Sequence, residues 1–233
     1  MPQTLRLTYG RVNMYPVIVR RPAAIFFLPP VVVVAATHRV SPVTESTPPI
    51  PHVAFQGEIG AFSEMAIRQQ WPDGARPVPS ATFPDALARV LAGDAHYAIV
   101  PVESAIVGRV EIALEALEAV GNALEVRAET RVPVHLCLLA PRGATLAELR
   151  EVHSHPVALA QCRIFFARHS WLVSTPHADT AGAARDVATA GERTRGAIAS
   201  AMAAERYGLE IIARHVEDVS ANWTRFVVVS KRD

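Results

Sequence analysis

The chain has 233 residues, of which 50% are hydrophobic and 19% are charged. This composition is typical of a globular protein with a substantial hydrophobic core. Lys and Arg number 23 against 22 for Asp and Glu, which gives a formal net charge of +1. A domain that binds nucleic acid through bulk electrostatics usually carries a strong basic excess, so we expect no nucleic-acid partner.

The first 51 residues differ from the rest because they are rich in Pro, Val and Arg and show no helical period. The apolar stretch 23–36 is the candidate membrane segment of this region. It is shorter than the roughly 20 residues that a spanning helix needs, and Pro29-Pro30 interrupts it. We therefore expect no membrane span, and interpret residues 1–51 as a disordered extension that ends in a proline-rich linker.

A targeting signal is the alternative for this region. Arg20-Arg21 ahead of the apolar stretch and Ala35-Ala36 at its end would suit a signal peptide. The long segment before them and the double proline count against it. The two cysteines, Cys137 and Cys162, form no Cys-x-x-Cys pair and lie in apolar runs, so we expect small buried thiols and a cytoplasmic protein.

The first organised half begins at His52 and alternates short strands with helices. The segment 81–92 shows the helical pattern clearly, since Phe83, Leu87, Val90 and Leu91 fall on one face. In chain order we predict a strand over 53–57, helices over 60–70 and 81–92, a strand over 97–102 and a helix over 110–120.

The second half repeats this alternation and supports the same fold class. We predict a strand over 132–140, helices over 146–151 and 157–169, and a strand over 171–174. A helix over 180–190, a strand over 197–199 and a helix over 201–207, which Gly208 ends, follow. A closing strand contains 224–226. Two such halves predict an α/β fold with two lobes around one cleft.

Three polar residues of the segment 153–162 allow more than one interpretation. His153 and His155 suggest a metal site, but no carboxylate or cysteine stands at a matching ligand spacing. Capping of the helix that starts at Pro156 is the better account of His155, and we expect no metal. Gln161 either hydrogen-bonds locally or shapes the cleft.

Several segments, in a consistent order, carry a resemblance to a known family. Gly57–Ser63 matches Gly-x-x-Gly-[Thr/Ala/Ser]-[Phe/Tyr]-Ser, and Val100–Gly108 matches in part Val-Pro-[Val/Ile]-Glu-Asn-Ser-x-x-Gly. Further matches are Ser154–Cys162 with Ser-His-Pro-Gln-Ala-Leu-Ala-Gln-Cys, then Asp179–Ala184, Ala197–Ser200, Tyr207–Leu209 and Asn222–Phe226. On these motifs the chain resembles the prephenate dehydratases, including the arogenate dehydratases, from residue 52 to residue 231.

The resemblance implies a two-lobed α/β fold like that of the type 2 periplasmic binding proteins, with the active site in the interlobe cleft. Lobe 1 would comprise about 52–132 and 215–233, and lobe 2 about 133–214. Many relatives also carry a C-terminal regulatory ACT domain, and for the chain as given we expect a catalytic domain without it, assembled as a homo-oligomer.

The implied reaction converts prephenate to phenylpyruvate with loss of water and carbon dioxide, in phenylalanine biosynthesis. It needs no cofactor, because aromatisation of the ring supplies the driving force. Arogenate is the alternative substrate, and a two-lobed small-molecule binding protein that has lost catalysis is the alternative function.

The resemblance also implies a set of site residues. Thr224 corresponds to the catalytic threonine, and Arg225 would pair with a substrate carboxylate; without the resemblance, Thr224 is an ordinary strand residue and Arg225 an ion-pair residue. The remaining predicted binding residues are Ala61, Phe62, Ser63, Glu103, Ser104, Ala105, Thr180, Asn222 and Phe226.

The Val100–Gly108 segment departs from the family pattern at two positions. Ser104 stands where Asn is usual, and Ala105 stands where Ser or Thr is usual. If these positions contact substrate, the change removes two hydrogen bonds, each worth about 1 kcal/mol net. Val157 in place of Gln is a milder departure. Substrate contact at these positions would then weaken activity or change specificity, but Glu103, Gly108 and the Thr-Arg-Phe element keep the family pattern, so we expect an active enzyme.

Overall fold

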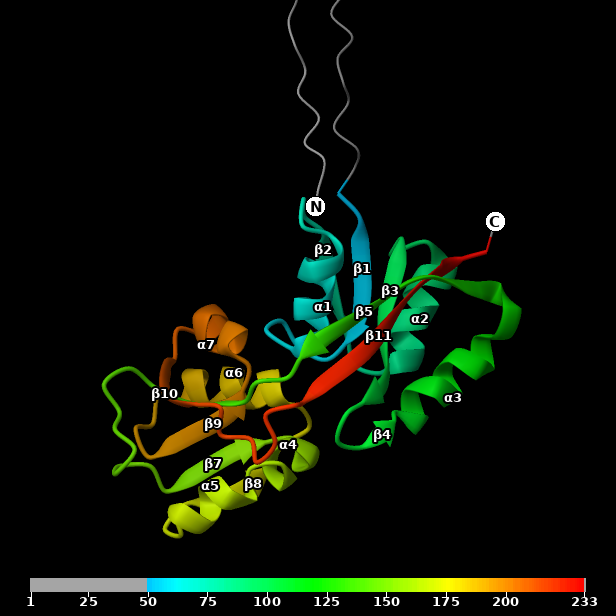
Figure 1. The fold of residues 1–233 in the computed structure, drawn as a ribbon. Coiled ribbons are helices and arrows are strands. Elements are labelled where there is room, and N and C mark those ends of the chain that lie inside the picture. Colours follow the sequence, from blue (N-terminus) through cyan, green and yellow to red (C-terminus); the bar gives the residue numbers. More distant parts are fainter. Residues whose placement is uncertain (1–49, 233) are drawn as a thin grey trace, which may run out of the picture. The chain divides into compact units, whose positions relative to one another are not determined.

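The computed structural model describes residues 50–232 (Figure 1). The predictions made for residues 1–49, an extension, a linker and a signal segment, lie outside the described residues. None of the described helices is long and apolar enough to cross a membrane.

The first of two sheets has six strands and carries the C-terminal strand in its middle. Its order is β2-β1-β3-β11-β5, with β4 paired to β3. β1 is parallel to β2 and β3, whereas β11 runs antiparallel between β3 and β5. The strands are β1 (His52–Gln56), β2 (Arg76–Ser80), β3 (Tyr97–Ser104), β4 (Gly108–Arg109), β5 (Leu124–Pro133) and β11 (Trp223–Lys231).

Helices cover both faces of this sheet, because neighbouring strand residues point to opposite sides. Val53 and Phe55 pack on the side of α1 (Phe62–Gln70), in one cluster with Phe226. Ala54 and Val100 pack on the opposite side against α2 (Phe83–Ala92) and α3 (Glu111–Val120). A short 3₁₀ turn, η1 (Gly121–Ala123), leads into β5.

The second sheet has five strands in the order β10-β6-β9-β7-β8. One face packs on α4 (Pro156–Ala160) and α5 (Arg163–Arg168), and the other on α6 (Thr180–Ala190) and α7 (Ala201–Tyr207). The strands are β6 (Cys137–Ala140), β7 (Glu151–Ser154), β8 (Val173–Pro176), β9 (Arg195–Ala199) and β10 (Glu210–Arg214).

Two connections, 134–136 and 215–222, carry the chain from one sheet to the other and are hydrogen-bonded to each other. The Val134 N–H donates to Asn222 O, and the Val216 N–H donates to Leu136 O, both at 3.0 Å.

The β1–α1 loop (57–61) also contacts the second half of the molecule. Ser200 Oγ donates to Gly60 O, and the Tyr207 hydroxyl donates to Ile59 O, both at 2.6 Å.

The α/β fold with two sheets confirms the predicted fold class, and α6 and α7 have the predicted bounds. Three element predictions are wrong. The run 132–140 is not one strand but the end of β5, a crossing segment and β6, since its apolar residues serve two different cores. The segment 146–151 forms no helix and leads into β7.

The predicted helix over 157–169 is broken between α4 and α5 at Gln161 and Cys162. The break has a long-range cause. Asp218, on the second connection, accepts hydrogen bonds from the N–H groups of Arg163 and Ile164 at 3.1 and 2.8 Å. A carboxylate in this position caps a new helix start, which apolar spacing along the chain does not reveal.

Candidate functional site

A cavity of about 290 Å³ lies where the C-terminal end of β3 and the start of β11 meet elements of the second sheet. Five of the predicted site residues line it together: Phe62, Ser104, Thr180, Asn222 and Thr224. The other lining residues are Pro101, Val107, Val110, Val134, Leu136, His155, Val157, Ala158 and Gln161. The cavity is therefore mainly apolar, with a small set of hydroxyl, amide and imidazole groups.

Strand pairing brings Thr224 and Ser104 together although 120 residues separate them. The two residues are direct partners in the antiparallel register of β11 and β3. Directly opposed residues of such a pair hold their Cβ atoms roughly 5 Å apart on one face of the sheet. Two hydroxyl groups thus stand side by side on the cavity wall.

The next pair in the same register faces away from the cavity. Arg225 is the partner of Glu103, and its Nε donates to Glu103 Oε2 at 2.9 Å while its other nitrogen donates to Glu129 Oε2 at 3.0 Å. These hydrogen bonds raise the pKa of the Arg225 guanidinium. Neither Arg225 nor Glu103 lines the cavity.

Asn222 joins the second connection to the end of α4. Its side chain is nearly buried, at 5% exposure of the residue, and Nδ2 donates to Gln161 Oε1 at 2.7 Å. Gln161 lines the cavity, as one of its two interpretations predicts, and its side chain accepts a hydrogen bond from Asn222, 61 residues away, rather than from a neighbour in the chain. The pair holds two amide groups at the wall in a defined orientation.

Two helices begin at the cavity, one from each half of the molecule. Phe62 and Thr180 are the first residues of α1 and α6, and both line the cavity. Within residues 50–232, the N–H groups of Phe62, Ser63, Thr180 and Ala181 have no hydrogen-bond partner. Free N–H groups at a helix start, together with the helix dipole, favour a bound carboxylate or other anion.

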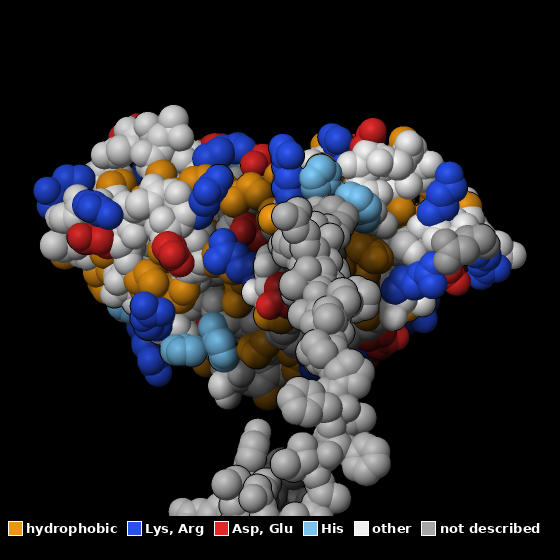
Figure 2. Space-filling view, turned by 90° about the horizontal axis from the view of Figure 1, so that it is seen from above, with side chains coloured by type: hydrophobic (Ala, Val, Ile, Leu, Met, Phe, Trp, Pro, Cys, Tyr) orange, Lys and Arg blue, Asp and Glu red, His pale blue; other side chains and the backbone are white. Residues whose placement is uncertain are grey.

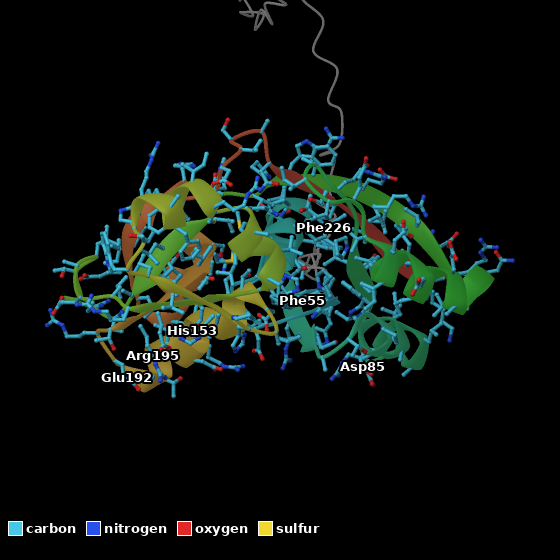
Figure 3. All side chains as sticks on the ribbon, turned by 90° about the horizontal axis from the view of Figure 1, so that it is seen from below. Phe55, Asp85, His153, Glu192, Arg195 and Phe226 are labelled. Atoms are coloured by element: carbon cyan, nitrogen blue, oxygen red, sulfur yellow. The ribbon has the colours of Figure 1, made fainter. Side chains whose placement is uncertain are left out.

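Four other predicted residues are not part of the lining. Ala61 is the N-cap of α1, and Ser63 follows Phe62 inside the first turn. Ala105 lies in the β3–β4 turn, where its N–H donates to Trp223 O. Phe226 is 2% exposed and belongs to the core with Phe55, as Figure 3 shows.

Three of the apolar lining residues, Val110, Val134 and Leu136, lie outside the recognised motifs, so no local signal points to them. His155 lies within a recognised motif, as do Pro101, Val107, Val157 and Ala158, but capping is the role that the sequence predicts for it. Its Nδ1 accepts a hydrogen bond from the Val157 N–H at 3.2 Å, which confirms the predicted capping role. The same side chain also lines the cavity, so His155 is the one imidazole on its wall within residues 50–232.

No Lys or Arg lines this cavity among the described residues. The surface agrees with the balanced composition: on the face seen in Figure 2, basic side chains are scattered among acidic and apolar ones and form no continuous patch. A negatively charged ligand in the cavity would therefore depend on helix starts, amides and hydroxyls rather than on a cationic side chain.

Comparison with known proteins gives a consistent result. The family model described as "Prephenate dehydratase" matches residues 53–233. The chain is 42% identical over 180 residues to a "Bifunctional N-acyl-homoserine lactone acylase/prephenate dehydratase" of Komagataeibacter europaeus, covering 77% of this chain and 63% of that protein. It is 38% identical to "Arogenate dehydratase 1" of Petunia hybrida, covering 77% of this chain and 42% of the relative.

Among solved structures, a prephenate dehydratase from Arthrobacter aurescens in complex with L-Phe matches with a TM-score of 0.72 and 31% identity. The match covers 78% of this chain and 61% of that one, so the chain spans less than two thirds of the length of each of these relatives. The family match covers both sheets and includes Thr224 and the cavity around it. The chain therefore belongs to the prephenate dehydratase family.

Proposed function

We propose that this protein is a carbon–oxygen lyase that converts prephenate to phenylpyruvate, water and carbon dioxide, for phenylalanine biosynthesis. The observation that carries the proposal is the position of Thr224. It lines a cavity that also receives the first turns of α1 and α6, in a chain of the prephenate dehydratase family.

The reaction breaks two bonds of the substrate ring. The electron pair of the bond to the ring carboxylate moves into the ring as carbon dioxide leaves, and the ring hydroxyl departs from the opposite carbon. The departing oxygen takes up one proton, drawn ultimately from solvent, so that water is released. Thr224 is a weak acid, and its hydroxyl acts by donating a hydrogen bond to the oxygen as negative charge develops there.

The cavity offers two places for the two substrate carboxylates. One is the start of α1, with the free N–H groups of Phe62 and Ser63. The other is the start of α6, with those of Thr180 and Ala181. The two helices pack on different sheets, so a dicarboxylate bound to both starts connects the two halves. The apolar wall, including Pro101 and Val134, suits the ring between them.

Arg225 acts in this proposal as a positioning residue. Its ion pairs with Glu103 and Glu129 tie β11 to both neighbouring strands on the face opposite Thr224. Holding the start of β11 in register keeps the Thr224 hydroxyl beside Ser104. This role does not require Arg225 to touch the substrate.

The same observations support the arrangement of lobes expected from the sequence. We assign lobe 1 to about 52–132 and 215–233, and lobe 2 to about 133–214, with the cavity between them. Residues from both ranges line it, Thr224 from the first and Thr180 from the second. We also propose a homo-oligomer, as the family resemblance suggests, and a cytoplasmic location, which the two free, buried cysteines support.

Substitution of Thr224 tests the proposed reaction directly. Thr224→Ala removes the hydroxyl together with the γ-methyl group, and we expect kcat for phenylpyruvate formation to fall about 10²–10³-fold, the usual cost of losing one such donor. Thr224→Ser is the matched control, because it keeps the hydroxyl and should retain most of the activity. The measurement is the appearance of phenylpyruvate from prephenate, with circular dichroism of each variant to verify folding.

Full activity of Thr224→Ala would refute the proposed role of this residue. Tight binding of prephenate by the unmodified protein without any turnover would instead favour a binding protein with this fold.

A side-by-side comparison of kcat/KM for prephenate and arogenate decides the substrate. Ser104 lines the cavity where the family pattern has Asn, and Ala105 follows it where Ser or Thr is usual. We therefore expect Ser104→Asn to change the ratio of kcat/KM for prephenate to kcat/KM for arogenate.

A second activity, hydrolysis of an N-acyl-homoserine lactone, has one specific observation in its favour. The cavity combines an apolar wall with three hydroxyls, of Ser104, Thr180 and Thr224, and the imidazole of His155, the group types used in acyl transfer. Release of homoserine lactone from an acylated substrate, abolished by His155→Gln, would support it. The absence of release under conditions where prephenate is turned over would exclude it.

A further inference from the structure

The two connections between the sheets bring together three side chains with metal-binding groups. His135 lies on the first connection, and His215 and Glu217 lie on the second, up to 82 residues away in sequence. His135 Nδ1 is 3.1 Å from Glu217 Oε1, and His215 Nδ1 is 3.4 Å from the same oxygen. One atom of each of the three side chains lies within 4.8 Å of the other two.

These distances match the spacing of ligand atoms around zinc. Zn–N and Zn–O bonds of about 2.0–2.1 Å in a tetrahedral site place neighbouring ligand atoms about 3.3 Å apart. The two imidazole rings meet edge to face with their centroids 4.6 Å apart. Rotation of these two exposed imidazoles would direct both Nδ1 lone pairs at one point beside the carboxylate.

The carboxylate is held in place independently of any metal. The Glu217 side chain is only 1% exposed, and its second oxygen, Oε2, accepts a hydrogen bond from the Leu136 N–H at 2.8 Å. One oxygen is thus bound to the backbone of the first connection while Oε1 faces the two imidazoles. Outer hydrogen bonds of this kind orient metal ligands and strengthen binding.

The backbone at His215 is also unusual. Its φ is +54°, which makes it the one non-glycine residue with positive φ among residues 50–232. This left-handed conformation is uncommon for residues other than glycine, although His adopts it more often than most. In this protein it turns the His215 imidazole toward Glu217 and His135.

We propose that His135, His215 and Glu217 form a binding site for a divalent transition metal of the zinc class. Two imidazoles and one carboxylate suit zinc, cobalt and nickel rather than magnesium or calcium, which prefer oxygen ligands. Three protein ligands leave a fourth position for water. Because its ligands come from both connections, the metal would fasten the two segments through which the sheets are joined.

Metal titration of the full chain tests the site. We expect one equivalent of Zn²⁺ to bind in isothermal titration calorimetry, Co²⁺ to give the visible absorption of a four-coordinate ion, and Mg²⁺ to give no heat. Bound Zn²⁺ should also raise the melting temperature, since a ligand of the folded state stabilises it.

The variants His135→Gln and His215→Asn each remove one imidazole, and Asn tolerates the left-handed backbone at position 215. Each should weaken Zn²⁺ binding at least tenfold. His153→Gln is the matched control, because His153 Nε2 lies 3.2 Å from Glu151 Oε2 but belongs to no group of three metal-binding side chains among the described residues (Figure 3 shows its place in the second half). Thr224→Ala should bind Zn²⁺ like the unmodified protein, which separates this proposal from the proposed reaction.

Unchanged Zn²⁺ affinity in either His135→Gln or His215→Asn would overturn the proposal, as would the absence of saturable binding by the unmodified protein. Circular dichroism and melting curves without metal show whether each variant folds. If one variant fails to fold, Glu217→Gln replaces it, because the amide oxygen still accepts from the Leu136 N–H while the charge that binds the metal is lost. Unchanged affinity in that variant overturns the proposal equally.

Discussion

At the scale of single residues, burial decides the chemistry of the two cysteines. Cys162 is fully buried, and burial together with the nearby carboxylates of Asp218 and Glu217 raises the pKa of its thiol to about 12. Cys137 is 2% exposed, and burial raises its pKa as well. Because the thiolate is the reactive form, both groups are poor nucleophiles in the folded protein.

Alkylation with iodoacetamide tests the protection of the two cysteine thiols. At about pH 8 neither thiol should react with iodoacetamide in the folded protein, because thiols with raised pKa values stay protonated there. In denaturant both become exposed and both should react, so mass spectrometry should find no adduct in the first case and two in the second. Rapid modification of the native protein at either cysteine would contradict this account.

At the scale of elements, the β1–α1 loop is the piece that positions the start of α1 at the cavity. Gly60 in this loop has φ +92°, and a Cβ atom added there would come within 3.0 Å of the Cα of Ala203 in α7. The loop is held by Ser200 Oγ, which donates to Gly60 O, and by Glu64, whose carboxylate accepts from the Gly60 N–H at 2.6 Å. Close backbone approach therefore requires glycine at this position.

Gly60→Ala tests this requirement, with Gly74→Ala as its matched control. Gly74 also has a positive φ, +112°, but a Cβ there meets nothing within 4 Å. Backbone strain should cost both variants about 1–2 kcal/mol in the free energy of unfolding, whereas Gly60→Ala should lose about 1–3 kcal/mol more from the clash. Urea denaturation measures both losses. Equal losses of unfolding free energy in the two variants would show that α7 accommodates a Cβ at position 60 without a free-energy cost.

The clash in Gly60→Ala should also push the β1–α1 loop away from α7 and so affect the site. Moving residues 57–61 away from α7 displaces the N–H groups of Phe62 and Ser63, so we expect KM for prephenate to rise in Gly60→Ala and to stay unchanged in Gly74→Ala. This links the stability measurement to the proposed carboxylate site at the start of α1.

At the scale of the whole molecule, few side-chain hydrogen bonds and ion pairs of the described residues join the two halves away from the two connections. Arg185 of α6 pairs with Glu58 of the β1–α1 loop at 2.5 Å, and it also pairs with Asp186. Burial and the nearby Glu58 raise the pKa of the Tyr207 phenol, whose hydroxyl donates to Ile59 O. These groups hold the loop against α6 and α7.

A double-mutant cycle of Glu58→Gln and Arg185→Gln measures the strength of the ion pair. Both side chains are about two fifths exposed, at 38% and 42%, so we expect a coupling of about 0.2–1 kcal/mol. The coupling should shrink at high salt, because ions screen exposed charges. A coupling that does not depend on salt would mean that the pair is shielded from solvent, contrary to its exposure.

Local features of the sequence determined much of the fold. The helices α6 and α7 follow from apolar spacing, from the caps Asp179 and Ser200, and from glycines that end them in the left-handed conformation. These signals act over a few residues and need no partner elsewhere. The family motifs are local in the same way, and the sequence by itself therefore points to Thr224, Thr180 and Phe62 as site residues.

Only the tertiary structure decided how distant segments meet. Strand pairing set Thr224 beside Ser104 and turned Arg225 to Glu103 and Glu129, and Asp218 divided the predicted helix over 157–169. The same long-range packing brought His135 to His215 and Glu217. Periodicity within a segment shows which face is apolar, but the neighbour on that face depends on sheet order and register, which the whole chain settles together.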